Sequence, residues 1–292
     1  KYELTPVKPG GPVELGSGGM SVVYSAKEPS GRMVALKVLR ATRMGDPEAR
    51  ARFALEPKLY PMHPNIVRVY DVGEVKGTPF FTMELVQGES LQAMIEKRGV
   101  IPVSELALIL KDVAAALDAV HQRGIIHRDI KPSNILVRAS DKHVFLTDFG
   151  VARAPSYSSE PVTRANFSAP GTAAYMSPEQ VEGDPNLTPA SDVYSLAATA
   201  YHALTGKPPF NFEDEAVVRL KHATDLPTAP SKANSSVSKA VSDVIMRAMQ
   251  KQPSARYASA GEFANALISA LLPSQPAQFP TRLALIIGGV VL

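Results

Sequence analysis

A short polar segment in the middle of the chain gathers a carboxylate, an ammonium group and a carboxamide. It reads His-Arg-Asp-Ile-Lys-Pro-Ser-Asn over residues 127–134, and Asp148 begins an Asp-Phe-Gly sequence fourteen residues later. Asp129 can accept a proton from a hydroxyl group, and Lys131 can neutralise a phosphate in transit. Asn134 and Asp148 offer the oxygen ligands that Mg²⁺ shares with phosphate oxygens. The segment therefore predicts transfer of a phosphoryl group with the help of Mg²⁺, or of Mn²⁺ in its place.

The stretches on either side predict the scaffold that positions these groups. An apolar run with helical spacing covers residues 106–120, and two short β-like runs follow at 135–137 and 144–146. A loop between a helix and a hairpin can hold reactive side chains rigidly. Taken singly, each polar residue also fits an ordinary loop with an Asx turn at 132–134, but chance does not readily produce the joint pattern.

This joint pattern resembles the catalytic segment of protein kinases, and the chain resembles the eukaryotic-like Ser/Thr protein kinases of bacteria. The resemblance extends over about residues 2–272, nearly the whole chain. It implies a signalling enzyme that transfers the ATP γ-phosphate to Ser/Thr hydroxyls of protein substrates and autophosphorylates its activation loop. It also implies phosphothreonine-binding modules as partners and a homodimer for autophosphorylation in trans. Lys131 argues against a tyrosine kinase, whose pattern carries other residues there.

The order of the expected elements predicts an α+β fold with two lobes. Residues 12–85 read as mostly strands with one helix, and helices dominate from residue 90 onward. We expect a β-rich, nucleotide-binding N-lobe over residues 1–86 and a larger helical C-lobe, for catalysis and substrate binding, over residues 87–272. The short β-branched or aromatic runs lie at residues 22–24, 34–39, 66–70 and 80–84. The expected helices of the C-lobe lie at residues 90–97, 104–123, 191–205, 213–222, 237–250 and 259–271.

Composition and charge narrow the class of protein. The chain has 292 residues, of which 45% are hydrophobic and 20% charged, as in a globular protein with a full core. The net charge of +3 comes from 31 basic and 28 acidic residues without a basic run, which argues against nucleic acid as a partner. Since the chain has no cysteine, it forms neither a disulfide nor a thiolate metal site.

Both ends of the sequence predict a piece cut from a longer protein. The chain begins with Lys1, and the Pro/Gln-rich residues 273–282 read as a juxtamembrane linker. Residues 283–292 form a wholly apolar run, which we interpret as the start of a truncated transmembrane helix; a buried strand or helix is the alternative. With Arg282 at its edge, this run predicts a cytoplasmic kinase domain anchored in the inner (plasma) membrane by one helix.

Glycines cluster between two strand-like runs near the N-terminus. Leu-Gly-Ser-Gly-Gly-Met-Ser-Val-Val occupies residues 15–23, and glycine lets a hairpin backbone approach phosphates closely. A plain hairpin is the alternative, and a dinucleotide-binding fold is disfavoured because no helix opens at this loop. The resemblance implies that the loop binds the nucleotide, although Ser21 stands where the family usually has a third glycine. The residues concerned are Leu15, Gly16, Ser17, Gly18, Gly19, Met20 and Ser21.

One lysine interrupts an apolar strand-like run. A buried Lys37 needs a partner, whereas an edge lysine would extend into solvent. The resemblance implies that Lys37 binds the ATP phosphates and pairs with Glu56 on the following helix. Asp46 is the expected N-cap of that helix and Pro47 its first residue. Pro57 directly follows Glu56 and removes a helical hydrogen bond, so we expect a shortened or kinked helix.

The resemblance also implies an apolar slot for the adenine base. Val23 and Ala35 are expected above the base and Leu136 below it, with plain core packing as the alternative. Backbone groups between the lobes are expected to bind the base, and a methionine to lie behind it. These residues are Glu84, Val86 and Met83.

A stretch rich in Ser, Thr, Pro and Ala separates Asp148 from Glu179 and is too long for an ordinary connection. It ends in Gly-Thr-Ala-Ala-Tyr-Met-Ser-Pro-Glu, which resembles the end of a kinase activation segment. The resemblance implies that Thr172 contacts Asp129 and Lys131 and helps to select Ser/Thr hydroxyls.

This segment also predicts a phosphate switch. Arg128 and Arg153 are expected to bind a phosphate on the segment, with Arg52 as a further candidate. Thr163 is the first expected phosphorylation site and Ser168 the second. The alternative for Arg128 is a structural pairing with a nearby carboxylate or carbonyl group.

Two further contacts are implied in the C-lobe. If Glu179 is buried it needs a cation, and the family places Arg256 there. Asp192 begins an apolar helix, where the helix dipole favours a negative charge, and is expected to bind the backbone of the catalytic loop.

Two other functions compete with this interpretation. A small-molecule kinase of related fold shares the spacing from Asp129 to Asn134 but lacks the segment at residues 171–179. A pseudokinase that only binds partners would normally have lost Lys37, Asp129 or Asp148, all of which are present.

Overall fold

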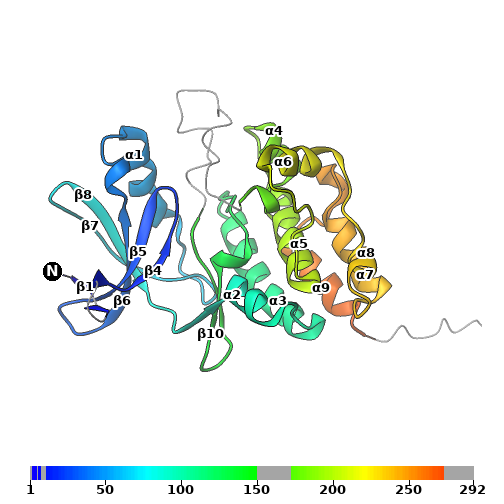
Figure 1. The fold of residues 1–292 in the computed structure, drawn as a ribbon, viewed down its shortest axis with the longest axis horizontal. Helices are drawn as coiled ribbons and strands as arrows, with labels where there is room; N and C mark the ends of the chain where they lie inside the picture. The colour runs from blue at the N-terminus through cyan, green and yellow to red at the C-terminus, as the bar shows by residue number, and fades with distance from the viewer. Residues whose placement is uncertain (1, 5, 8–10, 150–171, 273–292) are drawn as a thin grey trace, which may run out of the picture.

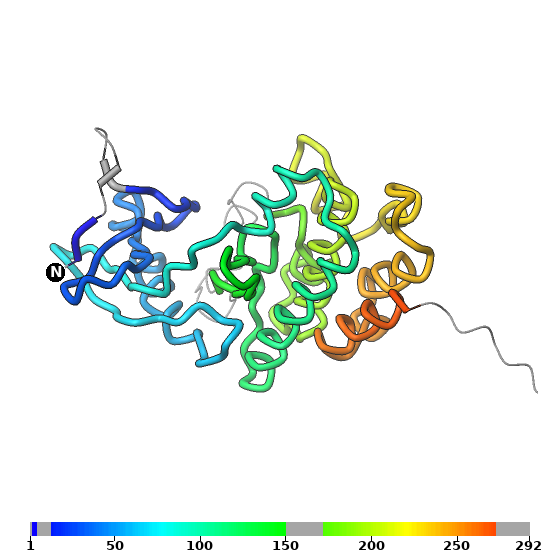
Figure 2. Tube along the Cα trace, turned by 90° about the horizontal axis from the view of Figure 1, so that it is seen from below, coloured from blue at the N-terminus to red at the C-terminus, as the bar shows by residue number. Residues whose placement is uncertain are grey.

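The computed structural model describes residues 2–4, 6–7, 11–149 and 172–272. These residues form two lobes, with the strands and one helix of the N-lobe on one side and a helical C-lobe on the other (Figure 1). The same division is visible from below, where the chain passes between the lobes after residue 84 (Figure 2). The predicted α+β architecture with two lobes is confirmed.

An antiparallel sheet of six strands builds the described part of the N-lobe, in the order β1-β5-β6-β8-β7 with β4 paired to β5. Its register sets Val23 opposite Lys37 and Ala35 opposite Met83. Because side chains alternate along a strand, Ala35 and Lys37 lie on the same face of β6. The strands are β1 (Glu3–Leu4), β4 (Glu14–Ser17), β5 (Ser21–Lys27), β6 (Met33–Leu39), β7 (Val69–Val75) and β8 (Thr78–Glu84), with a separate pair β2 (Pro6–Val7) and β3 (Gly11–Pro12).

One predicted strand is misplaced. We expected residues 66–70, whereas β7 begins at Val69. The residues before it pair with the C-lobe instead, since the Val67 N–H donates to the Leu146 carbonyl and the Leu146 N–H donates to the Asn65 carbonyl. The two apolar side chains then diverge: Ile66 is buried in the core of the C-lobe, whereas Val67 is buried in the cluster of the N-lobe sheet.

Helix α1 (Pro47–Leu55) has the predicted start and the predicted early end. The Asp46 carboxylate accepts hydrogen bonds from the backbone N–H groups of Glu48 and Ala49, which satisfies two donors that have no partner within the helix. At Pro57 the α-helix gives way to a 3-10 turn over Glu56–Leu59. The expectation of a shortened helix is confirmed.

The described part of the C-lobe contains the six helices that were predicted, displaced by at most a few residues, and two short ones that were not, α4 and α7. A small sheet in the order β11-β10-β9 lies beside them, and its β10–β11 hairpin confirms the predicted β-like runs. The helices are α2 (Leu91–Arg98), α3 (Val103–His121), α4 (Pro178–Glu182), α5 (Pro189–Thr205), α6 (Glu215–Thr224), α7 (Pro230–Ala233), α8 (Lys239–Ala248) and α9 (Ala260–Ser269). The strands are β9 (Gly88–Ser90), β10 (Ile135–Arg138) and β11 (Val144–Leu146). Among the described residues of both lobes, the other 3-10 turns are Ala41–Arg43, Pro132–Asn134, Ala173–Tyr175 and Pro253–Ala255.

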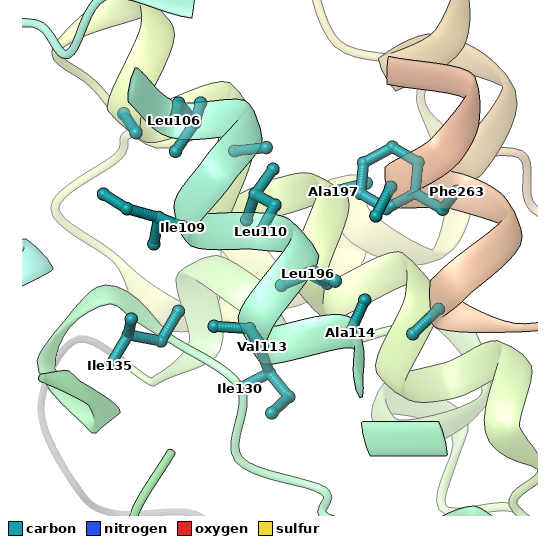
Figure 3. Close-up of a cluster of buried hydrophobic side chains, with 14 of the residues drawn as sticks. Leu106, Ile109, Leu110, Val113, Ala114, Ile130, Ile135, Leu196, Ala197 and Phe263 are labelled. Carbon is teal, nitrogen blue, oxygen red and sulfur yellow. The ribbon is translucent and has the colours of Figure 1, made fainter. Parts of the chain in front are cut away.

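The main core lies where α3, α5 and α9 meet (Figure 3). Leu110 and Val113 on α3 face Leu196 on α5, and Phe263 on α9 closes the same cluster. Burying side chains of this size stabilises the fold by about 1.5–3 kcal/mol each. This core fixes α3, which precedes the catalytic loop, and α5, whose Asp192 binds the backbone of that loop.

In the part of the chain that the structure describes, no helix combines the length and the apolar character needed to cross a membrane. The apolar run at residues 283–292, on which the expected anchor depends, lies outside the described residues.

Candidate active site

The catalytic loop between α3 and β10 brings the predicted polar groups together. The Lys131 ammonium lies 3.0 Å from the Asp129 carboxylate, and the Asn134 amide donates to the same carboxylate over 3.1 Å. A second bond from Asn134, to the Asp129 carbonyl at 2.8 Å, fixes the loop from its 3-10 turn. Lys131 also donates to the Thr172 hydroxyl at 3.2 Å, so of the two contacts predicted for Thr172 the one with Lys131 is present.

Asp192, on α5, holds the backbone of this loop, as predicted. Its carboxylate accepts hydrogen bonds from the N–H groups of His127 and Arg128 at 2.8 and 2.9 Å, and from His121 at 2.7 Å. Arg128 has a φ of 67°, a conformation that L residues rarely adopt, and the bond to its N–H stabilises it. Burial would raise the pKa of Asp192, but the hydrogen bonds and the nearby histidines lower it, so the buried carboxylate stays ionised.

Lys37 lies between two carboxylates. Its ammonium is 2.6 Å from Glu56 and 2.8 Å from Asp148, so the predicted Lys37–Glu56 pair is present despite Pro57. Burial favours the neutral lysine, but the two negative charges outweigh it and raise the pKa of Lys37 well above its ordinary value. Lys37 is therefore a permanent cation between α1 and the Asp-Phe-Gly sequence.

The glycine-rich loop forms the β4–β5 hairpin. The Gly18 N–H donates to the Ser21 carbonyl over 2.9 Å. Arg40, the residue after β6, donates from its guanidinium to the Gly18 carbonyl. A Cβ added at Gly16 would meet no atom within 4 Å, and Gly16 does not have a positive φ. Neither local packing nor backbone conformation requires glycine there, which agrees with a loop kept open for phosphate groups.

The residues expected around adenine gather in one apolar cluster. Ala35 and Met83 are buried in it, and Val23, Val86 and Leu136 pack against it. The cluster thus brings together residues from β5, β6, β8, the connection between the lobes and β10. The Glu84 N–H donates to the Arg68 carbonyl, so the Glu84 backbone can bind a base only by accepting a hydrogen bond at its carbonyl oxygen.

The donors for a metal ion fit Mg²⁺ bound together with phosphate. Asn134 uses its Nδ2 for Asp129, which leaves the Oδ1 as the atom able to ligate a cation, and the Asp148 carboxylate is the second donor. Among the described residues no group of three His, Cys, Asp or Glu side chains could hold a metal ion by itself. Mg²⁺ commonly takes one or two protein oxygens and completes its shell with phosphates and water, as this pair of donors requires.

The end of the activation segment is fastened to the C-lobe core. Arg256 forms a bidentate pair with Glu179 at 2.7 and 2.9 Å, as the resemblance implied. Gln180 donates to the Arg128 carbonyl and so joins α4 to the catalytic loop. Arg52 pairs with Glu48 within α1.

Three predicted residues of the phosphate switch, Arg153, Thr163 and Ser168, lie outside the described residues.

Sequence reasoning missed two buried histidines that hold the turn after Thr172. The His222 Nε2–H donates to the Ala174 carbonyl at 3.0 Å, and its Nδ1 lies 2.9 Å from the Tyr194 hydroxyl. His202 on α5 bonds to the Tyr175 hydroxyl at 2.7 Å. Burial lowers the pKa of His222 to about 3, so it is neutral at working pH and its tautomer is set by these two partners. A lone histidine in an apolar helical run gave no sequence signal for this role.

Tyr60 was also missed. Its ring lies 4.7 Å from that of Phe149, which in turn lies 4.6 Å from the His127 ring. The three rings pack against one another in tilted pairs and join the turn after α1 to the Asp-Phe-Gly sequence and to the catalytic loop. Nothing in the spacing of Tyr60 indicated this position.

Comparison with known proteins agrees with this geometry. The protein kinase domain model matches residues 12–268. The serine/threonine-protein kinase PknB of Mycobacterium leprae is 39% identical over 96% of this chain, and the chain spans 44% of that relative's length. The crystal structure of the Mycobacterium tuberculosis PknI kinase domain matches with a TM-score of 0.69 and 31% identity, covering 88% of this chain and 94% of that one. Rad53 1-466 in complex with AMP-PNP matches with a TM-score of 0.71 and 25% identity, covering 91% of this chain and 64% of that one.

The chain belongs to the protein kinase family. Within that family it is similar to serine/threonine-protein kinases of mycobacteria, which confirms the resemblance to the bacterial Ser/Thr kinases.

Proposed function

We propose that this chain is the catalytic domain of a bacterial protein kinase that transfers the γ-phosphate of ATP to Ser and Thr hydroxyls of protein substrates, with Mg²⁺ or Mn²⁺ as the metal. The contact of Lys131 with both Asp129 and Thr172 carries this proposal. The cation that meets the transferred phosphate thus lies within hydrogen-bond distance of two groups: the carboxylate that receives a hydroxyl proton and the end of the activation segment.

Each residue then has a defined part in the reaction. Asp129 orients the substrate hydroxyl and accepts its proton, and Lys131 offsets the negative charge on the transferred phosphoryl group. Lys37, held by Glu56, binds the phosphates that remain on the nucleotide. Asn134 and Asp148 would hold the metal ion, which supplies charge neutralisation on the phosphate oxygens when bound.

The experiment is a transfer assay with labelled ATP and the purified chain. The protein is incubated alone, with a generic protein substrate, and with aminoglycosides or sugars. Label on the chain and on Ser/Thr of the protein substrate is expected. Label on the small molecules alone would favour a small-molecule kinase, and no label anywhere would favour a partner-binding pseudokinase.

We further propose autophosphorylation in trans on Thr163, with Ser168 as a second site, and binding of the phosphate by Arg128 and Arg153. A phosphate adds about −1.5 to −2 charges at pH 7, so guanidinium groups near the catalytic loop favour this arrangement. Incubation with ATP should place phosphate on Thr163, and a Ser/Thr phosphatase should lower the activity. If the double variant Thr163→Ala, Ser168→Ala keeps full activity after phosphatase treatment, the segment is not a phosphate switch.

The cellular setting is a third proposal. The apolar run at residues 283–292 supports a single membrane helix and a kinase domain on the cytoplasmic side of the inner membrane. Homodimers and phosphothreonine-binding modules are proposed as partners from the family resemblance alone. Fractionation of cells that express the full-length protein tests the anchor: the kinase should sediment with membranes and resist salt extraction, and release by salt would contradict the anchor.

A further inference from the structure

Tyr60 takes part in a closed set of hydrogen bonds around Lys37. The Asp148 N–H donates to the Tyr60 hydroxyl oxygen at 2.9 Å, and the Tyr60 hydroxyl lies 3.3 Å from the Glu56 carboxylate. Glu56 accepts from Lys37 at 2.6 Å, and Lys37 donates to the Asp148 carboxylate at 2.8 Å. The path of hydrogen bonds begins and ends at Asp148, and we call these four residues the Asp148 network.

The chemistry of the groups determines which one donates and which one accepts in the Asp148 network. A phenol has one hydrogen, and an ionised carboxylate can only accept. Since the Tyr60 oxygen accepts from the Asp148 N–H, its own hydrogen is free to bond to Glu56. The phenol therefore relays between a backbone donor and a buried anion, and bonds of this charge-assisted kind are among the stronger ones in proteins.

The backbone of Asp148 needs such support. Its φ is 59°, in the left-handed region that residues other than glycine seldom occupy. The same residue presents the carboxylate that is bonded to Lys37 on one side. A change of this backbone would redirect the carboxylate, so the bond to the N–H also controls where the carboxylate points.

The ring of Tyr60 and its hydroxyl have separable functions. The centre of the aromatic ring lies 4.7 Å from that of Phe149 and 6.3 Å from that of Phe81, both as tilted pairs, and a phenylalanine would keep these contacts. Only the hydroxyl forms hydrogen bonds within the Asp148 network. The 3-10 turn that Pro57 imposes ends at Tyr60, where the chain becomes extended and leaves the helix.

We propose that Tyr60 is a positioning residue, whose hydroxyl holds the Asp148 backbone and keeps Glu56 on Lys37 so that the Asp148 carboxylate is presented to the metal–nucleotide. This inference rests on the proposed function, in which Asp148 is a metal donor. A tyrosine that only fills the core would need its ring and not its hydroxyl.

The test is Tyr60→Phe, with nucleotide affinity measured in EDTA and in saturating Mg²⁺. The ratio of the affinity in Mg²⁺ to the affinity in EDTA should fall by about tenfold in the variant, as expected from the loss of hydrogen bonds that involve a charged group. The affinity in EDTA should change by less than about twofold, because the apolar slot is untouched. Tyr2→Phe is the matched control: it removes a tyrosine bond to the Asp71 carboxylate, 2.8 Å long, on the N-lobe sheet, and should leave the ratio unchanged.

Hydrogen exchange of the protein without nucleotide provides a second readout. The Asp148 amide should exchange at least about tenfold faster in Tyr60→Phe than in the wild type, and at the same rate in Tyr2→Phe. If the ratio of the nucleotide affinity in Mg²⁺ to that in EDTA is the same for Tyr60→Phe and the wild type, the positioning role is wrong, whatever the exchange rate. If the wild type itself shows no gain in affinity with Mg²⁺, the proposed function of Asp148 fails, and the exchange rate still decides whether the hydroxyl holds the backbone.

Discussion

Replacing Arg256 by Met should destabilise the domain severely. The guanidinium is fully buried, with 0% of the side chain exposed, and forms the bidentate pair with Glu179. It also donates to three backbone carbonyls, those of Gln250, Ala190 and Lys251, at 2.7 to 2.9 Å. Methionine fills similar space but leaves a buried carboxylate and three carbonyls without this donor, and breaking one side of a buried ion pair costs about 3–5 kcal/mol.

Urea unfolding of both proteins measures this loss. A domain of ordinary stability has about 5–15 kcal/mol in total, so the midpoint should move well outside experimental error. Arg98→Met is the matched control, since Arg98 forms an equally bidentate pair with Glu105, but with 36% and 38% of the side chains exposed. Exposed pairs contribute about 0–1 kcal/mol. If the two substitutions cost the same, burial of the Arg256 pair is not what stabilises it.

The same variant has a predictable pH dependence. Burial would raise the pKa of Glu179, but the bonds from Arg256 and Ser191 lower it below its ordinary value. A carboxylate with a depressed folded-state pKa stabilises the protein above its unfolded pKa of about 4.3 and loses that contribution as the pH falls through the folded-state value. In Arg256→Met, Glu179 should protonate more readily in the folded state. The difference in stability between the two proteins should therefore shrink between pH 7 and pH 3, and a constant difference would contradict this reasoning.

Two further predictions concern the site itself. Glu56→Gln should lower kcat by roughly 10- to 100-fold, because Lys37 loses a charge-assisted bond worth about 1.5–3 kcal/mol, and steady-state kinetics with unchanged kcat and ATP KM would refute the pair. His222→Asn keeps a group near Tyr194 but loses the donor to the Ala174 carbonyl, whereas His222→Gln can restore that donor. The KM for a protein substrate should rise about tenfold in the first variant and recover in the second, and equal KM values would show that the bond to Ala174 does not position the turn.

The catalytic loop could be predicted from sequence because its chemistry is local. Asp129, Lys131 and Asn134 lie close together in the sequence, so a single loop brings their side chains near one another. The early end of α1 was equally predictable, since Pro57 cannot continue an α-helix. The Lys37–Glu56 pair required more than local rules, because only the packing of α1 on the sheet decides whether residues 19 positions apart meet.

What sequence could not supply depends on long-range packing. The bonds of Tyr60 to Asp148 and of His222 to Ala174 join residues 88 and 48 positions apart. Neither residue type nor spacing marks such partners. The displaced start of β7 has the same origin: residues 66 and 67 have strand-like side chains, but the C-lobe hairpin offers them backbone partners first.

In the proposed reaction, Asp129 accepts the proton of the substrate hydroxyl. Initial rates of γ-phosphate transfer to a protein substrate should be compared for the wild type and Asp129→Asn, after equal melting temperatures and equal ATP affinities have been shown. General-base catalysis contributes about 10²–10⁴-fold, so the rate should fall by at least about 100-fold. Transfer by Asp129→Asn at close to the wild-type rate would contradict the assignment of this loop as the catalytic centre.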